Sequence, residues 1–123
     1  MNKILIIDDS KVMRNIHKNT LKEHDIDETR FLEAENGAQA LNLLMNNEVD
    51  FIIIDWNMPQ MDGMQFVTKI RADAKYEKVP IIMVTSEAAR ENVMQAVKAG
   101  VTNYVVKPIT GERLWQKFKD YIN

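Results

Sequence analysis

The chain has 123 residues and a formal net charge of −2, with 46% hydrophobic residues, 28% charged residues and no cysteine. This length suits one compact domain, and the lack of cysteine excludes disulfides, thiolate zinc sites and cysteine nucleophiles. With no basic surplus for nucleic acid and no apolar run long enough for a membrane span or a signal peptide, a cytoplasmic protein is expected.

Short apolar runs alternate five times with segments of helical hydrophobic period. In chain order the pattern predicts strand 3–7, helix 11–24, strand 29–34, helix 38–45, strand 51–54, helix 63–71, strand 80–84, helix 88–99, strand 104–106 and helix 111–121. Strands that are apolar on both faces and separated by helices indicate a parallel sheet between two helix layers. We therefore expect a flavodoxin-like, doubly wound α/β fold of three layers, with residues 1–123 forming a single domain and no output domain after it.

Polar side chains follow four of the five predicted strands. Asp8 and Asp9 follow the first, Asp55 the third, Thr85 the fourth and Lys107 the fifth. Ligands of open α/β sheets bind outside the carboxyl ends of the strands. We therefore expect three carboxylates, a hydroxyl and an ammonium group to meet at one edge of the sheet. We assign no chemistry to the end of the second strand.

Each of these residues also has a simpler explanation. Asp8-Asp9-Ser10 and Thr85-Ser86 are common types of helix N-cap, Asp55 could begin a turn, and Lys107 could be a surface residue before a proline. A coincidence of caps, however, predicts neither the lysine nor an acid placed directly after an apolar strand. The combination therefore favours a shared site.

Converging carboxylates repel one another and raise one another's pKa unless a cation lies between them. Mg²⁺ is the expected cation, since it prefers oxygen ligands and binds through a few carboxylates and a phosphate. We expect Asp9 and Asp55 to supply direct oxygens and Asp8 a direct or water-mediated one. A backbone carbonyl near Asn57 would complete the metal site.

This set of groups favours phosphoryl transfer, which depends on positioning and charge neutralisation more than on acid–base groups. Lys107 would add a second positive charge, and the Thr85 hydroxyl would donate a hydrogen bond to a phosphoryl oxygen. Asp55 would be the nucleophile, because a carboxylate is ionised at neutral pH and needs no general base. Neither His17 nor His24 lies at a strand end.

The ordered set Asp8-Asp9, Asp55, Thr85 and Lys107-Pro108 resembles the receiver domains of two-component response regulators, over residues 3–121. The resemblance implies that Asp55 is the phospho-acceptor, with a histidine kinase as the donor and one Mg²⁺ as the cofactor. In this family the peptide bond that corresponds to Lys107–Pro108 is often cis. The protein would then be no enzyme, except that it assists its own phosphorylation and dephosphorylation.

The family resemblance further implies how a phosphate would become a signal. Thr85 and Tyr104 would be the switch residues, and Asn57 and Glu87 would tune the lifetime of the phospho-aspartate. The readout face would comprise the fourth helix, fifth strand and fifth helix. Its candidate residues are Ala88, Ala89, Arg90, Val93, Tyr104 and Lys117.

Within the family, the stretches 55–59, 85–88, 91–92 and 99–108 are similar to the single-domain chemotaxis regulators. This similarity implies a flagellar motor switch protein as the partner of a monomeric chain that binds neither nucleic acid nor membrane. It leaves a dedicated phosphatase open. Ser86, Ile109 and Trp115 depart from the pattern, which affects the partner surface and not the site chemistry.

Three alternatives remain. A stand-alone receiver in a non-chemotactic phosphorelay would have the same site chemistry. A Mg²⁺-dependent phosphohydrolase with an aspartyl nucleophile would need a second aspartate two residues after Asp55, where this chain has Asn57. A flavodoxin-like nucleotide binder would need phosphate-cradling donors after the first strand, where Asp8 and Asp9 would repel a phosphate.

Overall fold

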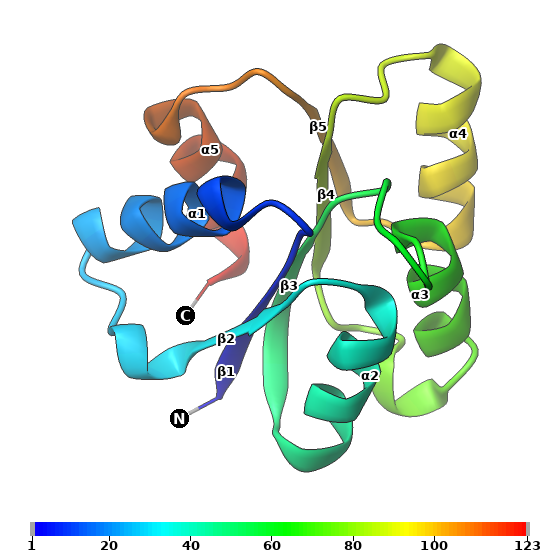
Figure 1. The fold of residues 1–123 in the computed structure, drawn as a ribbon, viewed down its shortest axis with the longest axis horizontal. Helices are drawn as coiled ribbons and strands as arrows, with labels where there is room; N and C mark the ends of the chain where they lie inside the picture. Colours follow the sequence, from blue (N-terminus) through cyan, green and yellow to red (C-terminus); the bar gives the residue numbers. More distant parts are fainter. Residues whose placement is uncertain (1, 123) are drawn as a thin grey trace.

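The computed structural model describes residues 2–122 and contains one sheet of five parallel strands. The strand order is β2-β1-β3-β4-β5, and helices cover both faces of the sheet (Figure 1). The strands are β1 (Lys3–Ile7), β2 (Phe31–Ala34), β3 (Val49–Ile54), β4 (Ile81–Thr85) and β5 (Asn103–Val106). The predicted doubly wound parallel fold is confirmed.

The described residues also form five α-helices and three short 3-10 helices. The α-helices are α1 (Lys11–Glu23), α2 (Gly37–Asn46), α3 (Gly63–Arg71), α4 (Arg90–Ala99) and α5 (Gly111–Phe118). The 3-10 helices are η1 (Glu28–Arg30), η2 (Ala74–Tyr76) and η3 (Lys119–Tyr121). Between residues 2 and 122, no helix combines the length and the apolar character that crossing a membrane requires.

The core has two parts, one on each face of the sheet. Successive strand residues point to opposite faces. Ile4 and Ile6 of β1 therefore pack with α1 and α5, while Leu5 and Ile7 pack with α2, α3 and α4. Figure 1 shows α1 and α5 together on one side of the sheet and the other three helices opposite. Coverage of both faces explains why β1, β3 and β4 are largely apolar on both faces.

Several predicted boundaries shift, each for a local reason. The strand predicted over 29–34 is shorter, because the Asp27 side chain caps the amide of Thr29 and turns 28–30 into η1. The fourth strand runs one residue later than predicted, so Thr85 is its last residue. The last helix ends at Phe118, and the predicted residues beyond it form η3, a tighter turn common at helix ends.

The prediction that Ala88 and Ala89 begin the fourth helix is wrong. Ala89 has extended backbone angles (φ −62°, ψ 136°) and is the residue before α4. The Tyr104 hydroxyl donates to the carbonyl of Glu87 at 2.6 Å, which holds this loop against β5. Alanine has a high helix propensity, but Ala89 is extended in this loop, which the contact between Tyr104 and Glu87 holds in place.

Candidate functional site

The carboxyl ends of β1 and β3 place two aspartates side by side. Ile7 and Ile54 are paired in the sheet, and Asp8 and Asp55 follow them directly. The Asp55 amide donates to the Ile7 carbonyl at 3.0 Å, and the Asp8 amide donates to the Ala34 carbonyl of β2 at 3.1 Å. Both aspartates therefore continue the backbone pairing of the sheet, which fixes their positions at its edge.

Three carboxylates converge at this edge. Asp8, Asp9 and Asp55 each offer an oxygen, and these oxygens lie within 4.8 Å of one another. Asp8 is 1% exposed and Asp55 8% exposed, whereas Asp9 is open to solvent. Burial raises the pKa of Asp8, and the charge of Asp55 adds to that rise, while the Ser10 amide and Lys107 oppose it. The cluster is therefore costly to keep charged without a cation.

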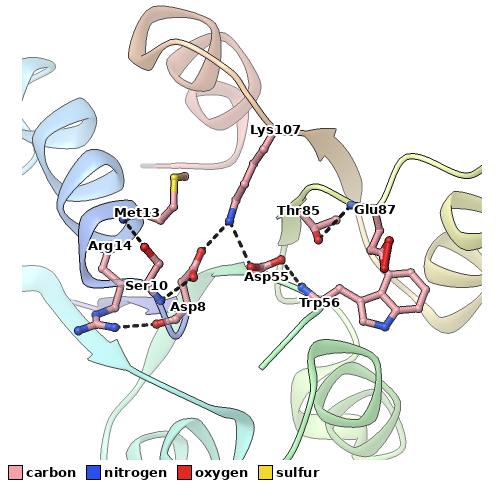
Figure 2. Close-up of polar contacts among 9 residues, drawn as sticks. All are labelled: Asp8, Ser10, Met13, Arg14, Asp55, Trp56, Thr85, Glu87 and Lys107. Atoms are coloured by element: carbon pink, nitrogen blue, oxygen red, sulfur yellow. Dashed lines mark hydrogen bonds and ion pairs between the residues drawn. The ribbon is translucent and has the colours of Figure 1, made fainter. Parts of the chain in front are cut away.

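Lys107 lies between the two buried carboxylates. Its Nζ is 3.1 Å from Asp8 Oδ2 and 3.1 Å from Asp55 Oδ2 (Figure 2). Burial alone would lower the pKa of Lys107, but the charges of Asp8 and Asp55 outweigh it and raise that pKa. The Lys107 amide donates to the Thr85 carbonyl at 2.8 Å, and the bond to Pro108 is cis.

Backbone amides hold the second oxygen of each buried carboxylate. Ser10 N donates to Asp8 Oδ1 at 2.9 Å, and Trp56 N donates to Asp55 Oδ1 at 2.7 Å. The Ser10 hydroxyl accepts from the Met13 amide and caps α1. The simpler reading of residues 8–10 as helix caps therefore holds for Ser10 alone. Thr85 and Ser86 cap no helix, because α4 begins after Ala89.

Gly63 lets α3 begin close beneath Asp55. Its amide donates to the Trp56 carbonyl at 2.8 Å. A Cβ atom at Gly63 would lie 2.2 Å from the Asp55 backbone oxygen, which no real side chain tolerates. Only glycine fits this approach without moving the backbone of Asp55.

The predicted switch residues Thr85 and Tyr104 lie on β4 and β5, and the predicted lifetime residues Glu87 and Asn57 lie in the loops after β4 and β3. Thr85 is fully buried, and Figure 2 shows it at the next strand end beyond Asp55. The Glu87 amide approaches Thr85 Oγ1 at 3.4 Å, and the Glu87 carbonyl accepts from Tyr104. Burial raises the pKa of half-buried Tyr104, with smaller effects from Glu87 and Asp55. Asn57 is exposed in the loop after β3.

The residues predicted for the partner face lie around the start of α4, on β5 and on α5. Tyr104 and Lys117 line a groove of about 580 Å³ whose lining residues all belong to β5, α5 and the segment between them. Ala88, Ala89 and Arg90 are exposed around the start of α4, and Val93 is half-buried one turn further on.

Arg14 and Glu33 are two site-associated residues that the sequence reasoning missed. Arg14 is buried in the first turn of α1, and its Nη1 donates to the Asp8 carbonyl at 2.7 Å. Its Nε donates to Glu33 Oε1 at 2.9 Å, and Lys18 binds the other Glu33 oxygen. In the sequence, this pair is indicated by a basic residue in the first turn of the helix after Asp8-Asp9 and by an acidic residue on the second strand.

Neither histidine is part of the acidic cluster. His17 on α1 is 1% exposed and packs edge-on against Phe118 of α5, with ring centroids 5.9 Å apart. Its Nδ1 has no hydrogen-bond partner, and burial together with the charge of Lys107 lowers the pKa of His17 to about 3. His24 is exposed and stacks on Trp115 at 4.1 Å.

Comparison with known proteins agrees with this geometry. Residues 4–119 match the response regulator receiver domain family. A chemotaxis protein CheY homolog of Campylobacter jejuni is 50% identical over 98% of this chain and 92% of its own length. Chemotaxis protein CheY1 of Helicobacter pylori is 44% identical over 95% of this chain and 94% of its own length.

Among solved structures, the chemotaxis response regulator CheY4 of Vibrio cholerae has a TM-score of 0.88, with 32% identity and 99% of each chain covered. CheY-like response regulators are generally signalling proteins and not enzymes. The chain belongs to the response regulator receiver domain family and is a CheY-like receiver of two-component signalling.

Proposed function

We propose that Asp55 accepts a phosphoryl group from a histidine kinase, with Mg²⁺ held beside it by Asp8, Asp9 and Asp55. The observation that carries this proposal is the Lys107 ammonium, which lies 3.1 Å from both Asp8 and Asp55. A cation held between two buried carboxylates provides positive charge at the place where a phosphoryl group would gain negative charge.

The donor set suits Mg²⁺. Receiver domains bind this ion at an acidic cluster, and the cluster here offers carboxylate oxygens only, which matches the preference of a hard cation. Three carboxylates and one ammonium leave a formal charge of −2, from −3 and +1, which a divalent cation balances. Asp8, Asp9 and Asp55 would hold the ion, and the carbonyl of Asn57 is the proposed fourth protein ligand. When bound, Mg²⁺ supplies charge neutralisation on the phosphoryl oxygens.

The residues of the chain would then act as follows. A carboxylate oxygen of Asp55 forms a bond to phosphorus while the bond from phosphorus to the donor's imidazole nitrogen breaks, and the electron pair stays on that nitrogen. Lys107 and the Thr85 hydroxyl bind the transferred oxygens. The Trp56 amide, which donates to Asp55 Oδ1 at 2.7 Å, holds the carboxylate in orientation. Asn57 and Glu87 would control the access of water to the acyl phosphate.

The output would pass through the loop after β4. Movement of Thr85 toward the phosphoryl group would disturb the Glu87 amide that approaches its hydroxyl, and Glu87 is tied to Tyr104. The partner face is Ala88, Ala89, Arg90, Val93, Tyr104 and Lys117. Because the similar proteins are named chemotaxis proteins, the proposed partner is a flagellar motor switch protein. The chain would turn over no external substrate.

The acceptor is tested by incubating the protein with Mg²⁺ and acetyl phosphate and measuring its intact mass. We expect the gain of one phosphoryl group in the parent and in Asp50→Asn, and none in Asp55→Asn or without Mg²⁺. Asp50 is a matched control, since it is an aspartate on the same strand that pairs with Arg30 instead. Phosphorylation of Asp55→Asn would refute the assignment, and continuous release of phosphate from a phosphate ester would favour a phosphohydrolase.

The partner is tested by comparing binding of the phosphorylated chain to a flagellar switch protein and to a histidine phosphotransfer protein. We expect binding to the switch protein that requires phosphorylation and is lost when Arg90 and Val93 are replaced together. Retained binding in that variant would refute the proposed face. Phosphoryl transfer to the phosphotransfer protein, with no switch binding, would instead favour a non-chemotactic phosphorelay.

A further inference from the structure

We infer that Arg14, braced by Glu33, is a positioning residue for the metal site, because it fixes the turn that carries Asp8 and Asp9. This inference rests on the proposed function, since it assigns to Arg14 a role in the Mg²⁺ affinity of that site. Arg14 itself contributes no oxygen and touches no carboxylate of the cluster; its guanidinium binds the Asp8 backbone carbonyl and Glu33 (Figure 2 shows the first of these contacts).

The contact with Asp8 controls two side chains at once. The Asp8 carbonyl belongs to the peptide unit that joins Asp8 to Asp9, and a peptide unit is planar. Holding its oxygen at 2.7 Å therefore restricts ψ of Asp8 and φ of Asp9 together. These two angles set the directions in which the two carboxylates leave the backbone.

The turn is also closed from its other side. Ser10 donates its amide to Asp8 Oδ1, and the Ser10 carbonyl accepts the Arg14 amide at 3.0 Å. Arg14 thus binds Ser10 through its backbone and Asp8 through its side chain. Without the guanidinium, the Asp8 carbonyl would lose this hydrogen bond, and the peptide unit could rotate toward other donors.

Glu33 keeps the guanidinium in place. Arg14 Nε and Lys18 Nζ each lie 2.9 Å from a different Glu33 oxygen. Burial would raise the pKa of Glu33, but its bonds to Lys18 and Arg14 outweigh burial and lower that pKa. Glu33 is therefore charged at neutral pH. Groups that orient metal ligands from behind typically change metal affinity about 10- to 100-fold when they are removed.

The experiment measures Mg²⁺ affinity from the fluorescence of Trp56, which adjoins Asp55, in a chain carrying Trp115→Phe. We expect Arg14→Gln to weaken Mg²⁺ binding by about tenfold or more. Arg14→Lys keeps the charge but not the paired geometry, and should recover only part of the affinity. Glu33→Gln, which leaves Arg14 in place with a weaker partner, should fall between Arg14→Gln and the parent.

Arg30 offers a matched control at the opposite edge of the sheet. It is as buried as Arg14, and it likewise binds a backbone carbonyl, of Asn2, and a carboxylate, of Asp50. Arg30→Gln should lower the stability to urea about as much as Arg14→Gln and leave Mg²⁺ affinity unchanged.

The outcomes separate the two claims. Mg²⁺ binding in the parent with affinity unchanged in Arg14→Gln would overturn the positioning role alone. An equal loss of affinity in Arg30→Gln would also overturn it, because the effect would then be one of general stability. No Mg²⁺ response in the parent, checked by calorimetry, would overturn the proposed metal site and the inference with it.

Discussion

His17 should make this protein lose stability as the pH falls from neutral to about 5. Its side chain is buried between α1 and α5, its Nδ1 has no hydrogen-bond partner, and its pKa is lowered from 6.5 to about 3. The unfolded chain therefore takes up a proton near pH 6.5, whereas the native chain does not until the pH is far lower. A group whose pKa is lowered by folding contributes stability that is present above its unfolded pKa and is lost below it.

The size of the effect follows from the two pKa values. Each pH unit below 6.5 costs about 1.4 kcal/mol as long as the native imidazole stays neutral. At pH 5 the gap is 1.5 units, so the loss is about 2 kcal/mol relative to neutral pH. The Asp8 carboxyl acts in the opposite direction, because its raised pKa makes the native state gain stability as the pH falls.

Because the two groups oppose each other, the measurement is the difference between the parent and His17→Leu. Urea unfolding at about pH 7.5 and about pH 5 gives the free energy of unfolding of each protein. We expect the parent to lose about 2 kcal/mol more than His17→Leu between these conditions. His24→Gln, at the exposed histidine, should behave as the parent does. An equal loss in the parent and in His17→Leu would refute the reasoning.

Three further predictions concern the site and its supports. Lys107→Met should lower the free energy of unfolding in urea by about 3 kcal/mol without Mg²⁺, because Asp8 and Asp55 then stay buried without the Lys107 ammonium. Added Mg²⁺ should stabilise this variant more than it stabilises the parent. Gly63→Ala should cost about 1–3 kcal/mol and also weaken Mg²⁺ binding seen by Trp fluorescence, because its Cβ would displace the Asp55 backbone. Gly100→Ala should cost about 1–3 kcal/mol in thermal unfolding with Mg²⁺ binding unchanged, since Gly100 has φ of 115° at the end of α4, remote from the site.

Much of the arrangement could be predicted from strand ends. Parallel strands bring their carboxyl ends to one edge, so residues that follow apolar runs in the sequence become neighbours in space. Asp8, Asp55 and Lys107 meet for this reason although 99 positions separate the first from the last. The strand pattern carries this information most clearly for β1, β3 and β4, which are buried on both faces along most of their length.

The supports of the site could not be predicted in this way. Arg14 on α1 bonds Glu33 on β2, 19 positions later in the sequence. The hydrophobic periodicity of a helix predicts its buried face but not which polar side chains of different elements will contact each other. The start of α4 also differs from the predicted one, because alanine favours a helix while the bond from Tyr104 to Glu87 holds an extended loop. Both failures concern side-chain contacts between elements, which local propensity does not encode.

The way the helices are anchored indicates where a change at Asp55 would reach the surface. Side chains cap four of the five α-helices: Ser10 caps α1, Asn36 caps α2, Asp62 caps α3 and Thr110 caps α5. The fifth, α4, begins at Arg90, and the N-cap residue before it, Ala89, provides no side-chain cap. Among the described residues of α4 only Ala96 is buried, so little apolar surface holds the helix to the sheet. Its first turn should therefore open more readily than the first turns of the four capped α-helices.

The loop that leads into this turn is the one that Thr85 and Tyr104 hold through Glu87. A phosphoryl group on Asp55 would add negative charge beside Thr85 and Lys107, at the ends of β4 and β5. The end of α4 at Gly100 is tied down by Arg71, whose Nε donates to the Gly100 carbonyl at 3.0 Å. Because α4 is anchored at its last turn and has no side-chain cap at its first, we expect its first turn to move on phosphorylation while its last turn stays in place. Amide hydrogen exchange in the first turn of α4 should therefore rise on phosphorylation, and exchange near Gly100 should stay constant.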